Sequence, residues 1–65
     1  MENNNAIFSE YPDVVELRDL QKMLSIGRNT ALSLLSSKTI NSFRIGNRYK
    51  IPKVSVIEFI AAQLV

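Results

Sequence analysis

The chain has 65 residues, and a domain of that length buries only about 60% of the surface that its unfolded form exposes, so a large enclosed catalytic cleft is not expected. Hydrophobic residues make up 46% of the sequence while glycine and proline number two each, which excludes a disordered or low-complexity chain. Cysteine and histidine are absent, so the sequence excludes disulfides, thiolate chemistry and the usual zinc ligands, and we expect no enzyme, no cofactor and no metal site.

Charge is distributed unevenly along the chain. Five of the six acids fall in the first nineteen residues, whereas the stretch from Lys22 to Val56 carries seven Lys or Arg and no acid. Such asymmetry predicts a cationic surface for an anionic partner, with a solvated basic face as the plain alternative. No apolar run approaches the roughly 20 residues that cross a bilayer, and the start of the chain does not read as a signal peptide, so we expect a cytoplasmic protein without a membrane partner.

The chain divides into a flexible leader, residues 1–10, and a folded domain, residues 11–65. Tyr11-Pro12 marks the boundary, because the residue before a proline is pushed out of the helical region. Ile7, Phe8 and Tyr11 are apolar enough to anchor the leader against the core.

A first short helix is predicted to begin near Glu16. Leu17, Leu20 and Leu24 follow the i, i+3, i+7 spacing of a helix with one apolar stripe. Ser25-Ile26-Gly27 interrupts this period, so the next helix starts in a new direction with Ile26 buried in the turn.

A second helix is predicted from about Arg28 to Ser37. At 100 degrees per residue, its apolar side chains gather on one face and small polar side chains on the other. The apolar face carries Ala31, Leu34 and Leu35, and the polar face carries Asn29, Ser33 and Ser36.

A β-hairpin follows, because the apolar period changes from 3.6 to 2 around Gly46-Asn47. A two-residue turn would set Ile45 opposite Arg48 and mix the two faces. A three-residue loop pairs Ile45 with Tyr49 and Phe43 with Ile51, since directly opposite residues share a face. We prefer the second register, which gives an apolar inner face and an outer face with Arg44 and Lys50.

A third helix is predicted from Pro52, which fits the first helical position, toward Leu64. Its packing stripe consists of Val56, Ile57, Ile60 and Leu64. Further apolar residues, Val54, Phe59, Ala61 and Val65, exceed what one small core covers, which indicates either a protein contact or a frayed end.

The predicted fold is α+β: a small winged helix-turn-helix of two short helices, a two-stranded β-hairpin wing and a C-terminal helix. The second helix of a helix-turn-helix fits the DNA major groove, where base edges display distinct donors and acceptors. Candidate DNA-binding residues on this helix are Arg28, Asn29, Thr30, Ser33 and Ser36. Polar residues that simply face water are the alternative.

The hairpin supplies the remaining candidates, because its cations have no carboxylate near them in sequence. They are Arg44, Asn47, Arg48, Lys50 and the adjacent Lys53. Arginine at a hairpin tip suits a narrow minor groove, and the other cations would hold phosphates. Cations that protect a sheet edge are the alternative.

The strings LRDLQKMLSIGRNTALSLL and FRIGNRYKIPKVSVIEFI resemble the excisionase-type helix-turn-helix domains, relatives of the MerR-like winged helices, over about residues 11–60. The lead-in AIFSEYPDVVEL is similar to that of conjugative-transposon excisionases. The chain departs from the family pattern at Gln21, Gly27 and Lys38, where a small residue, a serine or threonine, and a helix-ending glycine are usual.

This resemblance implies a recombination directionality factor of a mobile element, located at the bacterial nucleoid. Such a protein binds and bends double-stranded DNA at attachment sites and assists integrase, so integrase and further copies of the chain are candidate partners, and no small-molecule substrate is expected. A helix-turn-helix transcription regulator is the alternative. A protein-interaction module is the alternative of another class.

Overall fold

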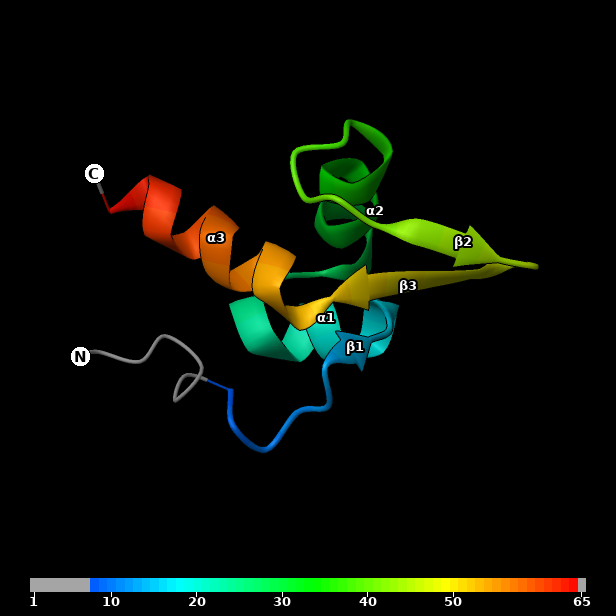
Figure 1. Ribbon diagram of the computed structural model, residues 1–65. Helices are drawn as coiled ribbons and strands as arrows, with labels where there is room; N and C mark the ends of the chain where they lie inside the picture. Colours follow the sequence, from blue (N-terminus) through cyan, green and yellow to red (C-terminus); the bar gives the residue numbers. More distant parts are fainter. Residues whose placement is uncertain (1–7, 65) are drawn as a thin grey trace.

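The structure is a computed structural model that describes residues 8–64 (Figure 1). The elements in chain order are β1 (Val14–Val15), α1 (Leu17–Leu24), α2 (Arg28–Ser36), β2 (Phe43–Ile45), β3 (Arg48–Pro52) and α3 (Lys53–Gln63). Three helices with an antiparallel sheet confirm the predicted α+β winged helix-turn-helix. Within residues 8–64, no helix has the length and apolar character needed to span a membrane.

The sheet has three strands rather than the predicted two, in the order β1-β3-β2. β1 pairs antiparallel with β3, with Val14 opposite Pro52 and Val15 opposite Ile51. A strand of two residues is too short to show an alternating apolar pattern, so β1 was not predicted from the sequence. Its pairing joins the start of the domain to the base of the hairpin.

The preferred hairpin register was wrong. The turn contains only Gly46 and Asn47, and Ile45 lies opposite Arg48. Gly46 has φ 62°, as the first position of a type II′ turn requires, and such turns match the twist of the two strands. A three-residue loop would instead need a left-handed residue at its last position, where this chain has an arginine.

The observed register also changes the faces of the hairpin. Tyr49 packs against the core and lies opposite Arg44, so these two share the face toward the helices. Phe43 lies opposite Lys50 on the other face and is 47% exposed. The prediction of an apolar inner face containing Phe43 and Ile45 was therefore wrong, as was the prediction that Arg44 and Lys50 share the outer face.

The helix-turn-helix itself follows the sequence prediction closely. α1 ends at Leu24, and the left-handed backbone of its C-cap Ser25 (φ 56°) turns the chain. Ile26 then packs partly buried against the core. Gly27 then caps α2 in an extended conformation. α2 buries Ala31 and Leu35 against α1, and Lys38 beyond it has φ 63°.

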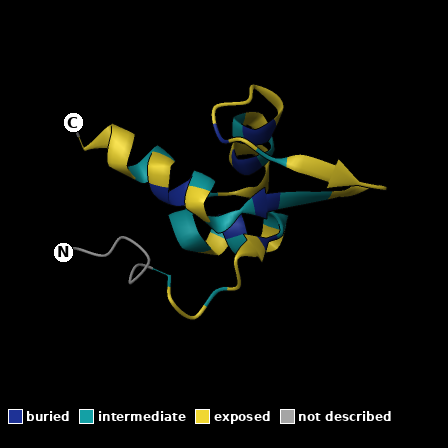
Figure 2. Cartoon of the chain, in the orientation of Figure 1, coloured by how far each residue is buried: buried dark blue, intermediate teal, exposed yellow. Residues whose placement is uncertain are grey.

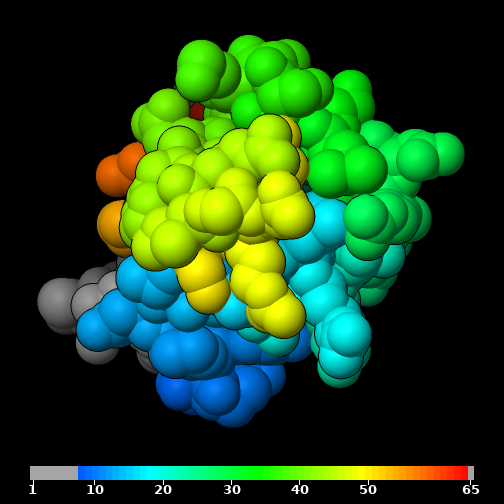
Figure 3. Space-filling model, turned by 90° about the vertical axis from the view of Figure 1, so that its right-hand side faces the viewer, coloured from blue at the N-terminus to red at the C-terminus, as the bar shows by residue number. Residues whose placement is uncertain are grey.

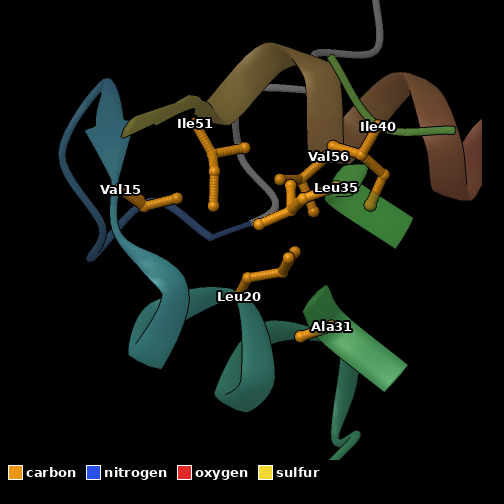
Figure 4. Packing of buried hydrophobic residues seen from close by; sticks show 7 residues of the cluster. All are labelled: Val15, Leu20, Ala31, Leu35, Ile40, Ile51 and Val56. Carbon is orange, nitrogen blue, oxygen red and sulfur yellow. The ribbon is translucent and has the colours of Figure 1, made fainter. Parts of the chain in front are cut away.

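One hydrophobic core joins all the elements except β2 (Figure 4). It consists of Val15, Leu20, Ala31, Leu35, Ile40, Ile51 and Val56. Ile40, in the connection between α2 and β2, is a core residue that no periodic pattern indicated. Burial is concentrated at this centre, and exposed residues dominate the hairpin tip and the end of α3 (Figure 2).

α3 begins one residue later than predicted, because Pro52 is its N-cap and the last residue of β3. Val56 and Ile57 are buried and Ile60 is partly buried, as expected, but Leu64 is 81% exposed and does not belong to the packing stripe. Phe59 packs against the core rather than extending an uncovered surface. Val65 lies outside the described residues.

The segment before β1 is anchored where the structure describes it. The rings of Phe8 and Tyr11 make an edge-on contact with centroids 5.9 Å apart, and the backbone N–H of Tyr11 donates to Phe8 O at 2.9 Å. Residues 1–7, Ile7 among them, lie outside the described residues, so the flexible leader stays a prediction.

Candidate nucleic-acid interface

The outer face of α2 is polar and open to solvent. All five candidate residues on it are exposed: Arg28, Asn29, Thr30, Ser33 and Ser36. Their side chains are short beyond the first position, and α2 carries no acid. A helix of this kind can approach base edges closely, because neither bulk nor negative charge keeps the duplex away.

The hairpin of β2 and β3, called the wing from here, projects from the body beside the helix-turn-helix. Figure 1 shows it leading away in the direction opposite to α3, and Figure 3 looks onto its tip, with residues of α1 and α2 (cyan to green) beside it. Asn47 and Arg48 at the tip are exposed. The wing and α2 can therefore face the same ligand.

An open groove lies between the helix-turn-helix and the wing. Its lining residues are Glu16, Leu17, Arg18, Asp19, Gln21, Arg28, Leu32, Arg44, Asn47, Arg48 and Tyr49. Four arginines, one each from α1, α2, β2 and β3, meet here although they belong to different segments of the sequence. The structure thus brings together four of the predicted residues, namely Arg28, Arg44, Asn47 and Arg48.

Arg18 and Gln21 are candidates that the sequence reasoning missed. Both lie on α1, which was interpreted only through its apolar stripe. Arg18 is exposed and lines the groove on the side of the helices. Its signal was available, since it is the one cation among the acids of the first nineteen residues.

Two of the wing cations form ion pairs with a carboxylate that is distant in sequence. Glu16 Oε1 accepts a hydrogen bond from Arg48 Nη1 at 3.0 Å, and Glu16 Oε2 accepts one from Lys50 Nζ at 2.6 Å. The hydrogen bond and charge of Lys50, with the Arg48 charge, lower the pKa of Glu16 below its usual value. The wing cations have no carboxylate near them in sequence, as predicted, but the fold brings Glu16 from a distant segment to two of them.

Lys53 lies apart from the groove. Its Nζ donates to the backbone oxygens of Tyr11 at 3.0 Å and Phe8 at 3.5 Å, and its backbone N–H donates to Asp13 O at 2.7 Å. These contacts tie the start of α3 to the segment before β1. Lys53 is thus placed with the leader and not with the other candidate residues.

Metal binding has no obvious site within residues 8–64. No group of three or more His, Cys, Asp or Glu side chains that could hold an ion occurs there. The groove has two carboxylates in its lining, Glu16 and Asp19, beside four guanidinium groups, and the guanidinium and amide groups are suited to phosphates and base edges.

Comparison with known families agrees with this geometry. Residues 15–64 match a family described as a helix-turn-helix domain, a span that begins in β1 and ends just after α3. No curated protein and no solved structure matches the chain.

Proposed function

The chain belongs to the helix-turn-helix domain family, a family of DNA-binding domains, and from this premise we propose that it is an excisionase-like protein of a mobile element. In this proposal it binds attachment-site DNA, bends it and assists integrase. The observation that carries the DNA-binding part is the groove, in which arginines of α1, α2 and the wing converge between two exposed polar surfaces.

Each surface has a separate task in the proposed complex. α2 enters the major groove, where Asn29 can bond adenine and Ser33 can bond bases or phosphates. Arg18, Arg28 and Arg44 hold phosphates, which supplies affinity and register but no reading of sequence. The wing tip enters the adjacent minor groove, where Arg48 reaches the phosphates along the edge of that groove.

The arrangement of α3 supports the excisionase part of the proposal. α3 points away from the wing (Figure 1), and Val54 on it and Leu64 directly after it are exposed. A protein partner such as integrase, or a further copy of the chain, can therefore be contacted while the wing and α2 occupy DNA. When several copies bind side by side and contact one another, their modest affinities multiply. Such a protein would be found at the nucleoid.

Binding to the DNA that flanks its own coding sequence tests this proposal. Purified protein should retard and footprint a defined site there, and the affinity should fall steeply with added salt because phosphate contacts release counterions. When the same site is placed at different positions in a duplex, the electrophoretic mobility of the complex should depend on that position, because the protein bends the DNA. Addition of integrase should stabilise the complex.

The outcomes separate the competing functions. A defined site without bending or integrase contact would point to a transcription regulator and overturn the excisionase role. Absence of any retarded band at low salt would overturn DNA binding altogether and leave a protein-interaction module.

A further inference from the structure

Glu16 is held at the wing by the short strand that precedes it. Val15 pairs with Ile51 in the sheet, so the next residue along the chain emerges beside the strand that carries Arg48 and Lys50. The contacts span 32 and 34 positions of sequence. Glu16 is also the N-cap of α1, where its backbone N–H donates to Asp19 Oδ2 at 3.1 Å.

The chemistry of this contact resembles that of a DNA phosphate. A carboxylate presents two anionic oxygens, and here one receives a guanidinium N–H and the other an ammonium N–H. The non-bridging oxygens of a phosphodiester would receive the same two donors. Two of the candidate DNA-binding cations, Arg48 and Lys50, are therefore already paired with an internal anion, and the three side chains together carry one net positive charge.

The two cations are not held equally. The side chain of Arg48 is 71% exposed, whereas that of Lys50 is 24% exposed and makes the shorter contact. Water screens an ion pair with so exposed an arginine and leaves it weak, so an approaching phosphate can displace the carboxylate from Arg48. Lys50 keeps Glu16 in place, and the negative charge stays beside the wing when DNA arrives.

We propose that Glu16 competes with DNA phosphates for Arg48 and thereby limits the affinity of the wing for DNA of any sequence. This inference rests on the proposed function, since it requires the wing to lie on DNA. Glu16 then occupies the position of a phosphate at Arg48 and must be displaced from Arg48 when DNA binds. Its charge, which stays beside the wing, also repels the DNA backbone.

Replacement of the charge alone tests the proposal. Glu16→Gln keeps the shape of the side chain and an oxygen that can accept a hydrogen bond. On a short duplex of mixed sequence at low salt, this variant should bind about three- to tenfold more tightly than the parent, and the slope of log affinity against log salt should steepen by about one unit.

Glu58→Gln is the matched control. Glu58 is exposed on α3, which leads away from the wing, and its replacement makes the same change in net charge. Its affinity should rise far less than that of Glu16→Gln. Equal gains in affinity by the two variants would overturn the proposal, because they would reflect net charge alone. A Glu16→Gln protein whose affinity for the duplex is unchanged or lower than that of the parent would overturn it as well.

A second variant identifies the route of the effect. In an Arg48→Ala background, Glu16→Gln should raise the affinity by at most about half as much as in the parent, because the cation for which Glu16 and phosphate compete is gone. A full gain in that background would overturn the competition for Arg48. If the parent chain bound no DNA at low salt, the proposed function would fail; if it bound DNA and Glu16→Gln bound no better, only this inference would fail.

Discussion

The guanidinium of Arg44 lies 5.0 Å from the centroid of the Tyr49 ring, and the two residues stand directly opposite each other in the β2–β3 pair. Tyr49 also packs partly buried against the core. The ring is therefore a fixed platform, and it holds a flexible cation at the edge of the groove. This contact exists only in the two-residue-turn register, because the other register places Arg44 opposite Lys50.

Removal of the aromatic platform should weaken DNA binding through Arg44. A cation–π contact at an exposed site contributes about 0.5–1 kcal/mol, so Tyr49→Leu should lose about two- to fivefold in affinity, measured by titration of a labelled duplex. Tyr49→Phe keeps the ring and should bind as the parent does. In an Arg44→Ala background the Tyr49→Leu loss should disappear, and a persistent loss would assign the effect to another contact.

Replacement of Lys38 by glycine should stabilise the folded domain. It has φ 63°, in the left-handed region where a side chain costs about 1–2 kcal/mol and glycine costs nothing. Lys38→Gly should raise the free energy of unfolding by about 0.5–1 kcal/mol after the greater freedom of unfolded glycine is subtracted. Lys38→Ala keeps the strain and should give no gain in urea unfolding, which separates backbone strain from charge.

Two apolar truncations should differ sharply in their effects. Leu35 is buried between α2 and the rest of the core, so Leu35→Ala should cost about 2–5 kcal/mol, much of the roughly 3–10 kcal/mol available to a domain of this size. Phe43 is half exposed on the wing, and Phe43→Ala should cost only about 1 kcal/mol. A Phe43→Ala protein that unfolds as readily as Leu35→Ala would contradict the observed register.

The ion pair of Glu16 should make stability depend on pH. Because the folded state lowers the pKa of Glu16, its contribution is present above the unfolded value of 4.5 and is lost as the pH falls through the lower folded value. The difference in unfolding free energy between the parent and Glu16→Gln should therefore shrink as the pH drops below 4.5.

Lys50→Met provides the control for this pH effect, since the hydrogen bond from Lys50 is the largest cause of the lowered pKa. The aliphatic stem stays in its half-buried position while the charge is lost. Urea unfolding of this variant across the same pH range should show a much weaker dependence. An unchanged dependence would mean that another carboxylate is responsible.

Local patterns in the sequence predicted those parts of the fold that local forces determine. The leucine spacing from Leu17 to Leu24 predicted the first helix of the helix-turn-helix, because it marks one apolar face. The break at Gly27 predicted where the second helix begins. The hairpin was predicted from its period, but its register depended on which backbone twist Gly46 would adopt. Alternation alone contains no information on that choice.

The remaining features arise from contacts between distant segments. β1 exists because Val14 and Val15 meet β3, and two residues carry no period of their own. The same pairing places Glu16 beside Arg48 and Lys50, so the charge of the wing could not be judged from its sequence neighbours. Of the groove, the sequence prediction included the cations on α2 and the wing. Arg18 on α1 was not predicted, although it stands out in the sequence as the one cation among the first nineteen residues.

The division of work between α2 and the wing should appear in two variants with opposite signatures. Arg48→Ala should lower affinity for every duplex by a similar factor and reduce the salt slope by about one, because a phosphate contact carries no sequence information. Asn29→Ala should leave the salt slope nearly unchanged. Its effect should be confined to the preferred site, where loss of a bidentate contact to a base costs about 1–3 kcal/mol.

Parallel salt titrations on the preferred site and on a duplex of mixed sequence measure both effects. The ratio of the two affinities should fall in Asn29→Ala and stay constant in Arg48→Ala, since only the former reads bases. Thr30→Ala, also exposed on the first turn of α2, serves as a control for surface change at that position. A ratio that changes in Arg48→Ala but not in Asn29→Ala would assign base reading to the wing instead of α2.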